Sequence, residues 1–152
     1  MKEHVKTSFF LLFTSPLWAL TIFGITGLAQ RYPHAIDVLP LITVHYDPIS
    51  GRYLLSGDYE LVYPTLLLLV LTLIFLWKTK VSLQKFGALA LLVPLITLIG
   101  AVFLSSISGR SGYRDDGMVL LVGFYIMPVI SFLLGMAVCV ICQKLIRGRS
   151  GG

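Results

Sequence analysis

Two cysteines three residues apart are the clearest candidates for chemistry in this chain of 152 residues. Cys139-Val140-Ile141-Cys142 is a CxxC motif, which becomes redox-active when a helix N-terminus lowers the pKa of a thiol. This pair falls instead at the end of a long apolar segment, where the dipole of a helix disfavours a thiolate. Zinc requires four ligands, and only His4 accompanies the two thiols on their side. We interpret both cysteines as small apolar helix residues, with redox or metal chemistry and lipidation as the alternatives.

Histidines and carboxylates between residues 30 and 60 form a second candidate site. The set comprises His34, His45, Asp37, Asp47, Asp58 and Glu60. A metal site or a His/Asp hydrolytic pair would use these residue types, but their spacing matches no such motif. We interpret them as exposed loop residues.

A glycine-rich segment at residues 108–117 contains Arg110 and Arg114, followed by Asp115 and Asp116. The two guanidinium groups suit an anionic headgroup, and the two carboxylates suit a cation. Pairing of these charges with one another, or with acids of residues 30–60, is the simpler interpretation.

Four long apolar segments must position these groups. Thr7–Ala29, Leu61–Trp77, Phe86–Gly109 and Gly117–Gln143 contain no Asp, Glu, Lys, Arg or His. About 20 apolar residues span the hydrocarbon core of a bilayer as a helix. The chain is 57% hydrophobic and only 12% charged, so we predict an all-α integral membrane protein, a single domain with a four-helix antiparallel transmembrane bundle. Ion pathways and haem or metal sites within a bilayer use ionisable side chains, which these spans lack.

The basic residues predict the orientation of the spans. With the N-terminus inside, eight lie on the inner side: Lys2, Lys6, Lys78, Lys80, Lys85, Lys144, Arg147 and Arg149. Four lie outside: Arg31, Arg52, Arg110 and Arg114. The positive-inside rule therefore predicts cytoplasmic termini in a plasma or inner membrane, with residues 30–60 outside. The net charge of +5 is explained by topology, and no basic patch is interleaved with stacking aromatics, so we expect no nucleic-acid partner.

The outer segment at residues 30–60 has the pattern of a β-hairpin. Leu41–Tyr46 is β-branched and aromatic, Asp47–Gly51 has turn chemistry, and Arg52–Leu55 predicts the returning strand. A two-stranded hairpin is marginal alone in water. We expect it to lean on the membrane, on the helix ends or on another protein, with the Val38–Leu41 run making that contact.

Prolines and small residues predict how the helices are shaped and packed. Pro16, Pro94 and Pro128 are expected to kink their helices, with a hinge or lateral opening for a ligand as the sharper alternative. Ser131-x-x-x-Gly135 is a small-xxx-small pattern that allows close helix approach. Leu66–Phe75 is almost entirely large and apolar, and is predicted to face lipid.

Two resemblances concern overall architecture. Size, four spans and a basic pI resemble the membrane-bound glutathione-transferase and prostaglandin-synthase group, and Glu60-Leu-Val-Tyr63-Pro64 is similar to a Glu…Pro stretch of that group. That group binds glutathione with Arg and Asn inside its helices, which this chain lacks. The architecture also resembles immunity proteins for pore-forming bacteriocins, although no residue motif carries this likeness.

The sequence favours a non-catalytic membrane protein that acts through protein–protein contacts, as an accessory, assembly or immunity-type protein. A binder or transporter of lipid-like molecules and a membrane enzyme with an extracytoplasmic site are the alternatives. Besides the bilayer, we expect a membrane or extracytoplasmic protein partner or a second copy of the chain, and no cofactor, metal or catalytic residue. Tyr and Arg dominate many protein contacts. The predicted contact residues are Tyr46, Arg52, Tyr53, Tyr59, Arg110 and Arg114.

Overall fold

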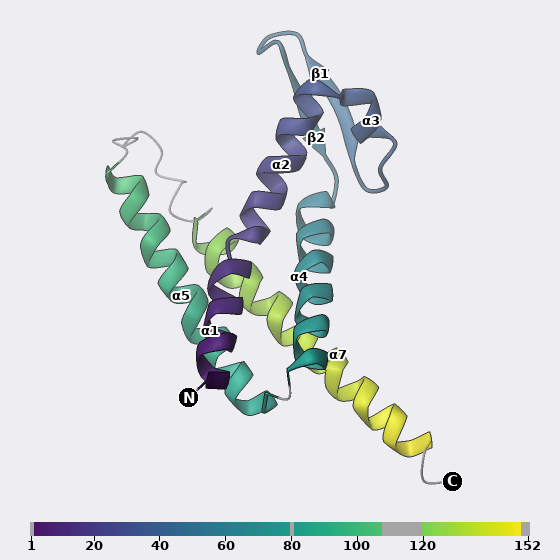
Figure 1. Cartoon of the computed structure of the whole chain (residues 1–152). Helices are drawn as coiled ribbons and strands as arrows, with labels where there is room; N and C mark the ends of the chain where they lie inside the picture. The colour runs from purple at the N-terminus through teal and green to yellow at the C-terminus, as the bar shows by residue number, and fades with distance from the viewer. Residues whose placement is uncertain (1, 80, 108–119, 150–152) are drawn as a thin grey trace.

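The computed structural model describes residues 2–79, 81–107 and 120–149 (Figure 1). Its elements are α1 (Lys2–Thr14), α2 (Leu17–Arg31), α3 (Pro33–Asp37), β1 (Thr43–Asp47), β2 (Arg52–Ser56), α4 (Tyr59–Lys78), α5 (Leu83–Ile107), the π-helix η1 (Val122–Ile126) and α7 (Met127–Arg149). Within these described residues, four helical segments are long and apolar enough to cross a membrane: Lys2–Arg31, Tyr59–Lys78, Leu83–Ile107 and Val122–Arg147. The prediction of a mostly helical protein with four such segments and a small two-stranded sheet is confirmed.

The first segment is broken where the proline predicts a kink. α1 ends at Thr14 and α2 begins at Leu17. Pro16 has no backbone N–H to donate, so the helical ladder is interrupted there. Ser15 is fully buried, and both its backbone N–H and its hydroxyl donate to Leu11 O, at 2.9 and 2.6 Å. These two hydrogen bonds stabilise the last turn of α1 next to the break.

One face of α4 is buried, which corrects the prediction that Leu66–Phe75 faces lipid. Pro64, Leu68 and Thr72 are fully buried, and Leu76 is 7% exposed. These residues are four apart, so they form one stripe along the helix. The stripe packs mainly against α7, while large residues on the other faces of α4 stay exposed. An almost uniformly apolar sequence gave no indication of which face is buried.

α4 and α7 approach each other closely at Gly135. A Cβ placed on Gly135 would lie 2.9 Å from Thr72 Cγ2 and 3.0 Å from Thr72 Cβ. Ser131, one turn earlier, is fully buried. The small-xxx-small pattern therefore marks a true helix contact, as predicted.

Four phenylalanines from four helices form the centre of the core. Phe10 of α1 stacks on Phe75 of α4, with ring centroids 4.1 Å apart. Phe86 of α5 contacts Phe75 at 6.2 Å and meets Phe132 of α7 edge-on at 6.5 Å. Phe86 and Phe132 are fully buried. Aromatic pairs in such offset and edge-on geometries add about 0.5–1.5 kcal/mol each beyond area burial.

A π-helix precedes Pro128 at the start of the fourth segment. Met127 N–H donates to Val122 O, five residues back, and Pro128 cannot donate to Phe124 O, four residues back. The Thr97 hydroxyl of α5 lies 2.7 Å from Pro94 O and 3.3 Å from Phe124 O. The Phe124 carbonyl, to which Pro128 cannot donate, is thus within hydrogen-bond reach of a neighbouring helix.

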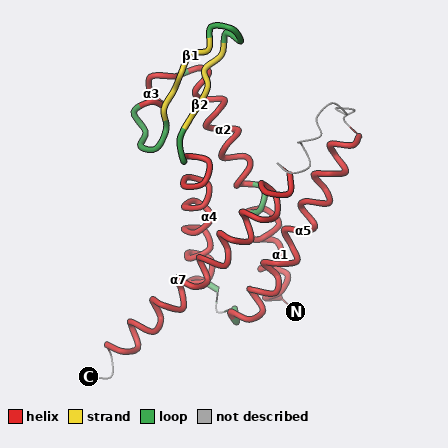
Figure 2. Tube along the Cα trace, turned by 180° about the vertical axis from the view of Figure 1, so that it is seen from behind, coloured by secondary structure: helices red, strands yellow, loops and turns green. Residues whose placement is uncertain are grey.

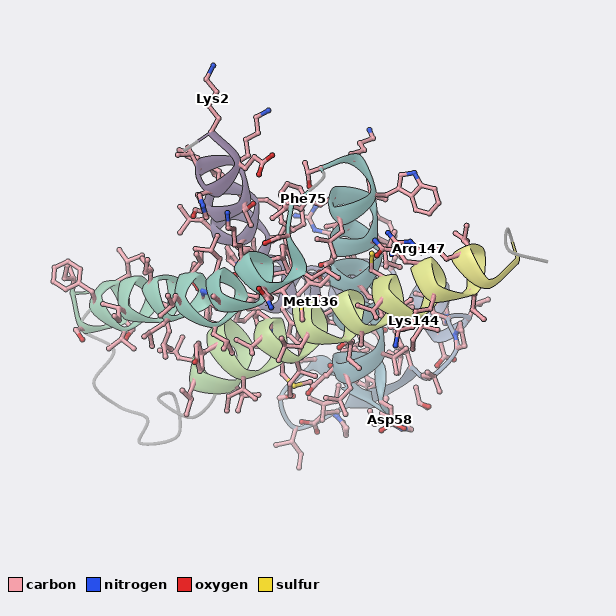
Figure 3. All side chains as sticks on the ribbon, turned by 90° about the horizontal axis from the view of Figure 1, so that it is seen from below. Lys2, Asp58, Phe75, Met136, Lys144 and Arg147 are labelled. Carbon is pink, nitrogen blue, oxygen red and sulfur yellow. The ribbon has the colours of Figure 1, made fainter. Side chains whose placement is uncertain are left out.

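The helices alternate in direction, but they do not run side by side throughout. The N-terminus, the end of α4, the start of α5 and the C-terminal end of α7 lie at one end, and the hairpin lies at the other (Figures 1 and 2). α5 and α2 diverge toward the hairpin end, and α7 crosses α4 and projects beyond it. Seen from below, Lys144 and Arg147 lie on this projecting part, away from the core positions of Phe75 and Met136 (Figure 3).

Candidate functional site

The two strands form the predicted hairpin, displaced by about one residue toward the C-terminus. β1 and β2 are antiparallel, and the register pairs Tyr46 with Tyr53 and Asp47 with Arg52. The rings of Tyr46 and Tyr53 lie 5.3 Å apart between centroids. Cross-strand aromatic pairs of this kind contribute roughly 0.2–1 kcal/mol to a sheet. The register therefore brings three predicted contact residues to the same end of the hairpin.

Asp47 closes the turn between the strands. Its carboxylate accepts hydrogen bonds from the backbone N–H of Ile49 and Ser50, at 3.0 and 3.3 Å, and from the Ser50 hydroxyl at 2.6 Å. The hydrogen bond from the Ser50 side chain, followed by that from the Ile49 backbone, lowers the pKa of Asp47. Gly51 has a φ of +66°, which a residue without Cβ adopts at no steric cost. The turn has the chemistry that the sequence predicts.

Polar side chains fix the hairpin to the helix ends. The amide of Gln30, at the end of α2, donates to Tyr53 O at 2.6 Å and accepts from Tyr53 N–H at 3.1 Å. This side chain thus pairs with β2 as a neighbouring strand would. Asp37 accepts from Val44 N–H at 3.0 Å, and the Tyr63 hydroxyl of α4 donates to Pro40 O at 2.7 Å. A hairpin that is marginal alone is therefore held at Tyr53 and Val44, and the segment before β1 is held at Pro40.

A small apolar core lies beneath the hairpin. Ala29, Ile36, Ile42 and Tyr59 are buried together, and Val44 and Leu55 pack on them. Ile36 belongs to α3, a one-and-a-half-turn helix that the sequence analysis did not predict. Pro33 in its first turn was the available signal, because proline is favoured at the start of a helix. We call residues 32–58, comprising α3 and the hairpin, the cap.

Two residues with positive φ meet where the chain leaves the hairpin for α4. Leu41 has a φ of +65° and Gly57 a φ of +120°. A Cβ on Gly57 would collide with Leu41 O, because the chain passes closely over itself there. Only glycine fits this crossing.

The far end of the cap presents an exposed, mostly apolar surface. Tyr46 is 59% and Ile49 is 96% exposed, Arg52 is exposed, and Tyr53, which pairs with Tyr46 across the strands, is half-buried. We call these four residues the cap tip. Tyr59, which was predicted with them, lies instead in the core beneath the hairpin and is 4% exposed. Its hydroxyl donates to the Glu60 carboxylate at 3.0 Å, so its role in the structure is to support the cap.

The other candidates from the sequence do not form a site in the described residues. Arg110 and Arg114 lie outside the described residues. His34 and His45 are exposed, and no group of three or more metal-ligating side chains occurs in residues 2–79, 81–107 and 120–149. Cys139 is buried and accepts a hydrogen bond from the Gln143 amide at 3.5 Å, whereas Cys142 is exposed.

Comparisons with protein-family models, curated proteins and solved structures gave no match. The chain's own residues therefore carry the functional argument.

A groove lies next to the cap, between α2, α5 and η1. It encloses about 890 Å³. Trp18, Ile22 and Phe23 of α2 form one wall, and Gly100 and Ala101 of α5 form part of the other. Further lining residues are Pro16, Ala19, Thr97, Leu104, Leu120, Val122, Gly123, Phe124 and Glu60. Among the described lining residues, Glu60 is the only charged one.

Trp18 and Gly123 shape the floor of the groove. Carbons of the Trp18 ring lie 3.7 Å from the position that a Cβ on Gly123 would take. The indole can therefore pack closely on η1 because residue 123 has no side chain. Trp18 is 6% exposed, and its Nε1 has no hydrogen-bond partner among the described residues. The prolines predicted kinks, with a lateral opening for a ligand as an alternative, but no feature of the sequence indicated this groove.

Proposed function

We propose that this protein is a non-enzymatic, multi-pass protein of the plasma or inner membrane that binds a protein partner through the cap tip. The observation that carries the proposal is the cross-strand pair of an exposed Tyr46 and a half-buried Tyr53 on a cap held by hydrogen bonds from both neighbouring helices.

The charge distribution supports an orientation with both termini in the cytoplasm. Lys2, Lys6, Lys78 and Lys85 and the basic residues of α7 gather at the end of the molecule opposite the cap. The positive-inside rule places such an end in the cytoplasm. The cap is then extracytoplasmic, beyond the apolar part of α2 and α4.

The composition and stiffness of the cap tip support a contact function. Tyrosine and arginine are enriched among residues that dominate binding energy, and each costs about 2 kcal/mol or more when truncated at such a position. A surface that is already ordered binds with a smaller entropic penalty. The Gln30 bonds to Tyr53 and the Asp47-closed turn order the start of β2 and the turn before it, before any partner arrives. An exposed isoleucine at the turn, Ile49, adds apolar area at the centre of the tip.

Photo-cross-linking in the native membrane tests the proposal. A photoreactive phenylalanine derivative at Tyr46 is expected to give one adduct of defined mass. Leu54 is the matched control, because it is 53% exposed and lies on the opposite face of the same hairpin. Tyr53→Ala should weaken the Tyr46 adduct without lowering the amount of protein in the membrane.

The proposal is contradicted if Tyr46 gives no adduct. It is also contradicted if Tyr46 and Leu54 give the same series of adducts, since that pattern reports random encounters.

A further inference from the structure

We propose that the groove between α2 and α5 binds one acyl chain of an outer-leaflet lipid whose headgroup carries a primary ammonium group facing Glu60. This site is separate from the cap tip, and it rests on the proposed function only in requiring that the chain is inserted in a bilayer with the cap outside.

The length of the groove favours a lipid chain. On α5 it runs from Thr97 to Leu104, which is about 10 Å of helix at 1.5 Å per residue. One leaflet provides half of a hydrocarbon core of about 30 Å. The groove therefore runs within a single leaflet, the one nearest the cap, and its volume of about 890 Å³ lies in the range of about 300–1,000 Å³ for small-molecule sites.

A transmembrane helix of a partner would need a longer surface, because it crosses both leaflets. In the other half of the molecule α1 packs on α5, and Phe10, Phe75, Phe86 and Phe132 fill the space where the helices meet. Among the described residues, the lining of the groove does not extend into that half. Above it, α2 and α5 diverge, and Gly100 has no atom within 4 Å of the position of a Cβ (Figure 1).

Charge complementarity indicates the headgroup. Glu60 lies in the first turn of α4, at the cap end of the groove, where lipid headgroups lie. It is exposed, and one of its carboxylate oxygens already accepts from the Tyr59 hydroxyl, which orients the group. An ammonium N–H can donate a charge-assisted hydrogen bond to the carboxylate, whereas a choline headgroup has no N–H to donate. A glycerol headgroup leaves the lipid with a net negative charge, which Glu60 repels.

The two tryptophans of the chain provide a direct test, because brominated acyl chains quench tryptophan fluorescence on contact. Trp18 lines the groove and Trp77 is 78% exposed on α4. In nanodiscs, Trp77→Phe leaves Trp18 as the reporter of the groove, and Trp18→Phe leaves Trp77 as the reporter of bulk lipid. A minor fraction of brominated lipid with an ethanolamine, choline or glycerol headgroup is added to an unbrominated choline-lipid matrix.

The relative binding constant obtained from Trp18 quenching should be about fivefold higher for the ethanolamine lipid than for the choline lipid. This ratio corresponds to roughly 1 kcal/mol, the value of a favourable exposed ion pair. Glu60→Gln should remove this preference. Ala101→Leu should lower Trp18 quenching by all three lipids, because leucine fills the groove. Quenching of Trp77 should show no headgroup preference in any variant.

If Trp77 is quenched normally, two results would refute the lipid-binding site without affecting the proposed function. One is Trp18 quenching that is equal for all headgroups and unchanged by Glu60→Gln and Ala101→Leu. The other is the absence of Trp18 quenching by all three lipids, which means that protein covers the groove. If neither tryptophan is quenched, the chain is not in the bilayer, and both this site and the proposed function fail.

Discussion

Gly135 provides the sharpest test of the helix packing. In Gly135→Ala the new Cβ would lie 2.9 Å from Thr72 Cγ2, whereas carbon atoms at optimal separation are about 3.5–4.0 Å apart. The contact is therefore at least about 0.6 Å too close. Thr72 cannot rotate away without losing the 2.7 Å bond from its hydroxyl to Leu68 O, so α4 and α7 must separate.

The expected magnitude combines two opposing terms. Overpacking of a tight core costs about 1–3 kcal/mol, and replacing a helical glycine by alanine gains about 1 kcal/mol. Gly135→Ala should therefore lower the free energy of unfolding by about 0–2 kcal/mol. Gly24→Ala is the matched control, because nothing lies within 4 Å of its Cβ position and the helix gain is the same. The difference between the two variants isolates the clash, at about 1–3 kcal/mol.

A second substitution tests the assigned contact itself. Thr72→Ser removes the methyl group that collides with residue 135 and keeps the hydroxyl that bonds Leu68 O. In the double variant, Thr72→Ser should recover part of the loss from Gly135→Ala, with a coupling energy of about 0.5–3 kcal/mol.

The assay uses a native thiol. In a Cys142→Ser background the buried Cys139 of α7 is the only cysteine, so its reaction with a thiol-specific dye during heating reports separation of α7 from the core. If Gly135→Ala and Gly24→Ala unfold at the same temperature, or if Thr72→Ser gives no coupling, the α4–α7 contact is wrong.

Four further predictions follow from the same structure. In a cysteine-free background, a cysteine replacing Ser50 should label only from outside and one replacing Ser82 only from inside; the reverse pattern refutes the proposed orientation. Leu68→Asp places a charge at a fully buried site in α4 and should prevent insertion or assembly, at about 2.5–3.5 kcal/mol for a mid-membrane charge, measured as membrane-integrated protein. Gly57→Ala should loosen the cap, seen as faster amide exchange in both strands, while the helices keep their protection. Because the folded cap lowers the pKa of Asp47, its stabilisation of the turn is present above the ordinary pKa of 3.8 and is lost as pH falls through the lower folded value, a transition that amide chemical shifts of the turn will follow.

The sequence predicted those parts of the fold that depend on local pattern. Uncharged runs of about 20 residues define membrane-spanning helices by length alone. Pro16 breaks its helix because it has no backbone N–H to donate. Asp47 to Gly51 form a turn because the Asp47 carboxylate accepts the backbone N–H of Ile49 and Gly51 adopts the positive φ. Gly135 was recognisable because close helix contacts select small residues.

The sequence could not indicate contacts that depend on which faces meet. The α4 stripe of Pro64, Leu68, Thr72 and Leu76 is buried, yet every face of that helix is apolar, so no periodicity distinguishes it. The π-helix before Pro128 brings Phe124 O within 3.3 Å of the Thr97 hydroxyl on another helix, a contact that no local pattern indicates. Gln30 pairs with a strand 23 residues further along, and glutamine at a helix end does not signal such a role.

The candidate site was predicted in part. Tyr46, Arg52 and Tyr53 were chosen by residue type, and the register of the hairpin brings them together. Tyr59 was chosen by the same criterion but lies in the core beneath the hairpin, because its position at the start of α4 points it toward Ile36 and Ile42. The groove beside α2 arises from the divergence of two helices, and no run of residues encodes that divergence locally.

Native mass spectrometry of the protein released from nanodiscs is the most direct test of the central claim, that the cap tip binds a protein partner. We expect a species heavier than the chain by the mass of one protein subunit. That species should disappear in the Tyr46→Ala/Tyr53→Ala variant and persist in Leu54→Ala, with all three proteins inserted to the same level. Detection of the chain alone, or of a complex that the two tyrosine substitutions leave intact, would contradict the account.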